Sequence, residues 1–136
     1  MLAEKMVVVI ADEAPIGVAL NTAALLGVAL GHHHDDVVGK DTVDGSGGIH
    51  TGMCAHPIPV LRASAEQLHE LRTQAVTRDG VTVHDMNQVA QKARTYEQMS
   101  ATLSGTKSED VEYLGLALYG PRPTIDSLTG ALKLYR

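Results

Sequence analysis

The sequence predicts an α/β fold, in which helices cover both faces of a four-stranded mixed sheet to give three α/β/α layers. Residues 5–11 form a continuous β-branched run without polar alternation, as in a strand buried on both faces. Further strand-like runs alternate with apolar stretches of helical spacing. The length of 136 residues suits one domain, residues 1–136, with a single core.

The first strand is followed by a strongly apolar helix. Pro15 fits the first turn of a helix, where its missing N–H costs nothing. In the helix predicted over 16–30, Asn21 and Thr22 are the polar residues. A helix of this kind is buried on most sides, so we expect the sheet on one side and a second cover, such as a partner subunit, on the other.

Residues 31–56 predict a long irregular loop, with short extended pieces at 37–38 and 49. The chain then resumes as a strand at 57–61, which its prolines place at a sheet edge. Ser64 and Gln67 form a capping box that opens the next helix, whose apolar stripe runs through Leu68, Leu71, Ala75 and Val76.

The last third predicts two more strands and several helical segments. A turn at 79–80 leads to a strand at 81–83, which ends at His84 and Asp85. A helical stripe from Met86 to Leu103 stops at Gly105, and residues 111–119 form the fourth strand. A Gly120–Pro121 turn, a short helix at 124–128 and an extended piece at 131–134 complete the chain.

The composition argues against binding to nucleic acids. The chain has no Phe, no Trp, four Tyr and a formal net charge of −5. Contacts to phosphates need clustered Lys and Arg, and binding of single strands needs aromatic platforms. We therefore expect no nucleic-acid partner, and a core built from aliphatic residues.

The single cysteine, Cys54, excludes an intramolecular disulfide and a zinc site made of cysteines. The first residues do not resemble a signal peptide. The apolar stretch from Ala14 to Leu30 is at the short limit for a membrane span and contains Pro15, Asn21 and two glycines, so a buried helix is favoured. We expect a cytoplasmic protein without a membrane partner.

Polar residues follow the predicted strands at the edge where open α/β sheets bind ligands. Asp12 follows the first strand, Asn21 lies on the next helix, and His84 and Asp85 follow the third strand. Gln88 is placed with this group. The alternative interpretation is that Asp12 and Asp85 are helix N-caps, a role that aspartate favours.

The loop at 31–56 holds several other reactive side chains. His32, His33 and His34 with the aspartates that follow them could bind a metal, as could His50 and His56 with Cys54. Neither spacing matches a known metal motif, which favours solvated histidines, and we expect no metal and no cofactor. A triad using Ser46 and a Cys54–His56 nucleophile pair remain open.

Four segments carry a resemblance to a known family. They are KMVVVIADEAPIGVALNTAALLGVALG at 5–31, HPIPVLRAS at 56–64, VEYLGLALYGP at 111–121 and TIDSLTGALKLYR at 124–136. The chain resembles a bacterial domain family of unknown function related to the class II (archaeal and eukaryotic type) peptidyl-tRNA hydrolases. The resemblance implies a four-stranded mixed sheet with helices on both faces, often assembled as a dimer.

The resemblance to the hydrolases also implies where a site would lie. Their catalytic aspartate matches Asp85, whereas their lysine at the start of the first helix falls in the stretch from Pro15 to Val18, which has no base. Their two threonines fall near Gly115 and Val89, and residues 91–112 are extra sequence. Since function depends on the site, we expect the fold to transfer and the hydrolase activity to be absent.

These observations predict a small protein that binds a small molecule or a protein partner around Asp12, Asn21, Asp85 and Gln88. As an enzyme, it would use Asp85 as a base, with His84, His50 or His56 transferring protons near neutral pH. One alternative is a divergent hydrolase of peptidyl-tRNA-like or other small esters. Another is a homodimeric interaction protein without catalysis.

Overall fold

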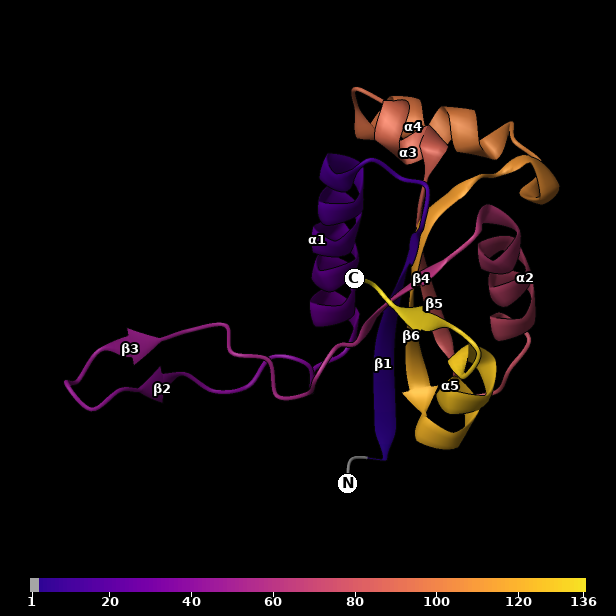
Figure 1. The fold of residues 1–136 in the computed structure, drawn as a ribbon. Coiled ribbons are helices and arrows are strands. Elements are labelled where there is room, and N and C mark those ends of the chain that lie inside the picture. Colours follow the sequence, from indigo (N-terminus) through magenta and orange to yellow (C-terminus); the bar gives the residue numbers. More distant parts are fainter. Residues whose placement is uncertain (1–2) are drawn as a thin grey trace.

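The computed structural model describes residues 3–136 and is built around a mixed sheet of five strands (Figure 1). The strand order is β5-β6-β1-β4-β7. Strands β1 and β4 are parallel, and the other neighbouring pairs are antiparallel. The strands are β1 (Glu4–Ala11), β4 (Val60–Ala63), β5 (Thr82–Asn87), β6 (Tyr113–Pro121) and β7 (Lys133–Leu134).

The predicted mixed sheet is confirmed, but the predicted number of four strands is wrong. The last extended piece of the chain becomes a fifth strand, because β7 pairs with β4 through Leu61–Leu134 and Arg62–Lys133. The same pairing corrects the position of β4, which was expected at an edge. Pro57 and Pro59 precede β4, so they leave its hydrogen-bonding groups free to pair on both sides.

Helices lie on both sides of the sheet, as predicted (Figure 1). Helix α1 covers one face, and α2 and α5 cover the other, while α3 and α4 lie beyond one end of the sheet. The helices are α1 (Ile16–His33), α2 (Ala65–Ala75), α3 (Gln88–Lys92), α4 (Tyr96–Ser104) and α5 (Arg122–Thr129), with a short 3-10 helix, η1 (Ser108–Asp110).

Strand β1 is the centre of the core, because alternate side chains enter the two apolar layers. Val7 and Val9 pack with α2 and α5, whereas Met6, Val8 and Ile10 pack with α1. All five side chains are buried. The β-branched run therefore forms a strand covered on both faces, as the sequence predicts.

Helix α1 is less buried than its composition predicts. One face, with Ala19, Thr22, Leu26 and Leu30, packs on the sheet. The opposite face is exposed along the helix. By length and composition α1 is also the one described helix that could cross a membrane, and 22% of Ile16–His33 is buried.

Strand β5 is longer than predicted, and this changes the segment that follows. It continues to Asn87, so Met86 belongs to the strand and not to a helical stripe. The expected long helix is two separate helices, since the side chain of Asn87 caps α3 and that of Thr95 caps α4. Gly120 and Pro121 similarly extend β6 where a turn was predicted. The capping box of α2 is confirmed.

Residues 38–55, named the arm below, extend away from the body of the molecule (Figure 1). The arm holds β2 (Thr42–Val43) and β3 (Ile49–His50), which pair with each other as a separate two-stranded sheet. Val38 pairs with Cys54 at its base. Each residue of the arm is exposed. The sequence predicts an irregular loop here, and the structure replaces it with an extended hairpin.

Candidate functional site

The carboxyl ends of β1 and β4 meet at one edge of the sheet, and a helix starts directly after each strand. Helix α1 follows β1 and α2 follows β4, and the two helices cover opposite faces. Where consecutive parallel strands send their helices to opposite faces, a crevice opens between the helix starts, and open α/β sheets bind ligands there. The fold therefore favours a ligand site at this edge.

A cavity of about 490 Å³ lies at this edge. Its walls come from the end of β1, the start of α1, the first two turns of α2 and the segment that enters β6. The lining residues are Ala11, Glu13, Ala14, Pro15, Ala65, Glu66, His69, Glu109, Val111, Glu112, Tyr113 and Leu114.

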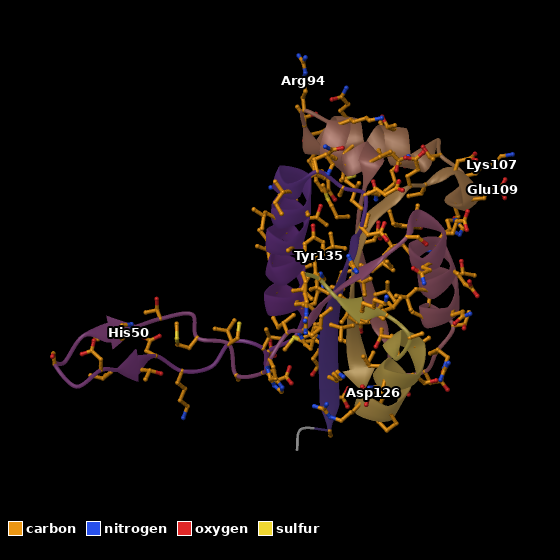
Figure 2. The ribbon with its side chains drawn as sticks, in the orientation of Figure 1. His50, Arg94, Lys107, Glu109, Asp126 and Tyr135 are labelled. Carbon is orange, nitrogen blue, oxygen red and sulfur yellow. The ribbon has the colours of Figure 1, made fainter. Side chains whose placement is uncertain are left out.

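The charge of the cavity wall has one sign. Glu13, Glu66, Glu109 and Glu112 line it, and no Lys or Arg is among its lining residues. Glu109 lies at the end of the body that carries η1 (Figure 2). Carboxylates gathered around a concave apolar surface give a negative potential, which concentrates cations and repels anions.

Tyr113 forms the inner wall of the cavity and is held by α2. Its ring lies 5.9 Å from the ring of His69 and 5.5 Å from the guanidinium carbon of Arg72, which faces the ring. His69 and Arg72 are three residues apart, so they lie on the same face of α2. Burial raises the pKa of Tyr113, Arg72 opposes this rise, and Asp85 adds to it.

Asp85 and His84, the residues predicted to be catalytic, point to opposite faces of the sheet. They were expected to follow a strand, but β5 runs to Asn87, and successive side chains of a strand alternate between faces. Asp85 accepts a hydrogen bond from Asn87 at 2.8 Å and lies near Tyr113, outside the cavity lining. His84 belongs to a cluster on the α1 face.

This second cluster joins the end of α1 to β5 and β6. The Nε2 atoms of His34 and His84 lie 3.1 Å apart, so one donates its proton to the other. The ring of His34 stacks on Tyr119 at 3.8 Å. Burial lowers the pKa of His34 and of His84, and His33 lowers both further.

Asp36 completes the cluster at the base of the arm. The Tyr119 hydroxyl donates to Asp36 at 2.8 Å, and His56 Nε2 lies 3.3 Å from the same carboxylate oxygen. Burial, the hydrogen bond to Asp36 and the charges of Asp36 and Glu4 raise the pKa of Tyr119 to about 12. His56 is thus a partner of Asp36 and lies near the amino end of β1, where it lines a cavity with Glu4 and Lys5.

Asp12 and Asn21 do not line the cavity at the carboxyl edge. Asp12 lines a separate cavity of about 310 Å³ with Arg62, Gln67 and Lys133. Asn21 is exposed on α1. The alternative role as a helix N-cap is wrong for both aspartates, because Pro15 precedes α1 and Asn87 caps α3.

Gln88 has a structural task close to the cavity. The side-chain oxygen of Gln88 accepts a hydrogen bond from the backbone N–H of Glu112 at 2.7 Å, and the backbone N–H of Gln88 donates to the Glu112 carbonyl at 3.0 Å. These bonds fix the segment that carries Glu112 into the cavity wall. Gln88 itself lines a different cavity of about 320 Å³, between α3 and α4.

His50 lies on the arm, away from the body of the molecule (Figure 2). Its Nε2 lies 2.8 Å from Asp44, which also accepts the backbone N–H groups of Ser46 and Gly48. These bonds lower the pKa of Asp44. Within residues 3–136, no group of three or more His, Cys, Asp or Glu side chains is arranged to hold a metal ion.

The comparisons with known proteins show the family. Residues 4–136 match the family described as "Protein of unknown function (DUF2000)". This chain belongs to that family. The predicted membership of a domain family of unknown function is therefore confirmed.

A solved structure shares the fold of this DUF2000 member. It is a protein of unknown function from Agrobacterium tumefaciens, with a TM-score of 0.91 and 21% sequence identity over 100% of both chains. Identity at this level shows the fold alone. No curated protein matches the chain at a significant level.

None of the residues that line this cavity is among the predicted site residues. Glu66 and His69 lie in the first two turns of α2, and their three-residue spacing after the capping box was a signal that could have indicated a shared face. Glu109 and Glu112 come from the extra segment at 91–112. No sequence pattern links that segment to α2, since only the fold brings them together.

Proposed function

We propose that this protein binds a small, positively charged ligand with an apolar part in the cavity at the carboxyl ends of β1 and β4. One observation carries the proposal: four glutamates and no Lys or Arg line a cavity whose remaining surface is largely apolar. Small-molecule sites combine an apolar concave surface with a few charged groups that select and orient the ligand.

The location supports a ligand site at this place, although it does not determine the charge of the ligand. The cavity lies in the crevice where α/β sheets bind ligands. The extra segment at 91–112 contributes Glu109, Val111 and Glu112. The part of the sequence that departs from the hydrolases therefore supplies half of the acidic wall.

We also propose that the fold is related to that of the class II peptidyl-tRNA hydrolases. The support is the resemblance of residues 111–121 and 124–136, which form β6, α5 and β7. The cavity covers the start of α1, where the resemblance implies a lysine in the hydrolases. Here Pro15 lies in the matching stretch and Glu13 precedes it, so the positive charge of that lysine is absent.

Three probes of similar shape test the proposed charge preference: choline, 3,3-dimethylbutan-1-ol and 3,3-dimethylbutanoate. Backbone amide shifts in ¹H–¹⁵N spectra report where each probe binds. We expect choline to shift residues of the cavity wall in a saturable way, the alcohol to bind more weakly, and the anion not to bind. Saturable binding of the anion at this cavity, or no cavity shifts with choline, would contradict the proposal.

A pair of variants identifies the groups responsible. Glu13→Gln combined with Glu66→Gln removes two charges from the wall, and both side chains are exposed, so the fold should be retained. We expect at least about a tenfold loss of choline affinity, as for the removal of paired charges. Glu97→Gln, on α4 and outside the cavity lining, is the matched control and should leave the affinity unchanged.

A further inference from the structure

Helix α1 has an uncovered apolar face on the side from which the arm extends (Figure 1). Ile16, Leu20 and Val28 are 65%, 65% and 69% exposed, and Leu25 lies beside them. No Asp, Glu, Lys or Arg occurs anywhere in α1. An exposed apolar surface of this extent is typical of an interaction site, and its occupant must itself be apolar and uncharged.

The arm carries a second uncovered apolar surface. Val43 and Ile49 are direct cross-strand partners, so they share one face of the hairpin, and they are 62% and 68% exposed. Thr42 and His50 form the neighbouring pair and point to the opposite face. The hairpin therefore has one apolar face and one polar face, and within residues 3–136 nothing covers its apolar face.

An isolated two-stranded hairpin is marginally stable in water, because it needs a third strand or a helix against its apolar face. Here β2 and β3 form a sheet of their own. The arm thus lacks a packing surface, and α1 lacks a cover. Each surface has the chemistry that the other requires.

The dimensions of the two surfaces also match. Helix α1 has 18 residues, which corresponds to about 27 Å at 1.5 Å per residue. From Val38 at the base of the arm to Ser46 at its tip, an extended chain spans roughly 26 Å. The arm is directed away from its own α1, so its apolar face is free to contact another molecule (Figure 1).

We propose that the chain forms a symmetric dimer in which the arm of each copy lies along the exposed face of α1 of the other. A twofold arrangement makes the two contacts equivalent, as self-complementary interfaces require. The polar face with Asp44 and His50 remains in water. The solved relative aligns over the full length of both chains, so the shared fold includes the arm segment. This inference is independent of the proposed ligand.

Sedimentation velocity at micromolar concentration tests the assembly. We expect a dimer for the wild type, and a dissociation constant at least about tenfold higher for Ile49→Asp on the arm and for Leu20→Asp on α1. Both positions are exposed in the single chain, so circular dichroism should show an unchanged fold. Thr42→Asp, on the polar face of the same hairpin, is the matched control and should remain dimeric.

A chain without the arm distinguishes this dimer from one in which two α1 helices pack together. Val38 and Cys54 are paired neighbours, so a short Gly-Ser linker can replace residues 39–53 without straining the body. We expect this variant to be a folded monomer. A monomeric wild type would overturn the proposal, and so would a dimer that persists without the arm.

Discussion

At the scale of single residues, the environment of Tyr119 leads to a prediction about its titration. Burial and the carboxylate of Asp36 raise the pKa of this phenol to about 12. Replacing Asp36 with Asn removes the negative charge and keeps the shape of the side chain. We expect the pKa of Tyr119 in Asp36→Asn to move back toward the ordinary value of 10.0.

Absorbance of tyrosinate during an alkaline titration measures this change. Tyr119→Phe identifies the signal of Tyr119 among the four tyrosines, since it should remove the component that titrates last. Because the folded state holds this proton more tightly than the unfolded state, the stabilising contribution of Tyr119 is present below pH 10 and is lost as the pH rises toward 12. An unchanged curve for Asp36→Asn would show that the hydroxyl does not contact Asp36.

The His34–His84 pair gives the opposite pH dependence. Burial and neighbouring histidines lower the pKa of both imidazoles below the ordinary value of 6.5. The unfolded state therefore binds protons first as the pH falls, so stability is present above pH 6.5 and is lost as the pH falls through the lowered pKa values.

We expect His84→Gln to weaken the acid dependence of Tm, because glutamine keeps a polar partner for His34 but does not titrate. Thermal unfolding between neutral and mildly acidic pH measures the slope. His32→Gln, exposed at the end of α1, is the control and should retain the wild-type slope. If His84→Gln has the same slope as the wild type, titration of the His34–His84 pair does not cause the loss of stability at acidic pH.

At the scale of elements, the contact between α1 and β6 is close enough to require a glycine. A Cβ atom on Gly115 would lie 2.7 Å from Thr22 Cγ2 and 3.0 Å from the carbonyl oxygen of Val9. Thr22 is buried and the Val9 carbonyl belongs to the central strand, so neither atom moves easily. We expect Gly115→Ala to lower the free energy of unfolding by about 1–3 kcal/mol.

Gly27 in the middle of α1 is the matched control, because nothing lies within 4 Å of a Cβ added there. Alanine is a better helix former than glycine, so Gly27→Ala should raise the free energy of unfolding by about 0.5–1 kcal/mol. Urea unfolding measures both variants. Opposite signs are expected, and a neutral Gly115→Ala would contradict the close packing of α1 on β6.

The elements that the sequence predicts well are those with a local physical signature. The β-branched run at residues 5–11 favours a strand that is covered on both faces, and it forms most of β1. Ser64 and Gln67 specify the start of α2 by two hydrogen bonds. Strand β5 was placed too short because Asp85 and Asn87 look like turn or cap residues. Pairing with β6 overrides that local preference as far as Asn87.

At the scale of the whole molecule, the place of the cavity follows from the topology, whereas none of the residues that line it was predicted. The rule for open α/β sheets indicates the edge after β1, and the cavity lies at that edge. The identity of the wall depends on which distant segments meet there, and the segment at 109–114 reaches α2 only through the pairing of β6 with β1. Asp12 and Glu13 are adjacent in sequence but line different cavities, so a cluster of polar residues does not define a shared site.

The charge of the whole molecule leads to a prediction about peptidyl-tRNA. Binding of a polyanion depends on Lys and Arg that displace counterions from phosphates, and it is strongest at low salt. This chain has a formal net charge of −5, and four glutamates line the cavity beside the start of α1, where the resemblance implies a lysine in the hydrolases. We expect neither binding nor cleavage of peptidyl-tRNA, even in low-salt buffer. Filter binding and release of the peptide measure the two properties, with an active class II hydrolase as the positive control. Saturable binding that weakens as salt is added would show that a basic surface dominates over the acidic cavity.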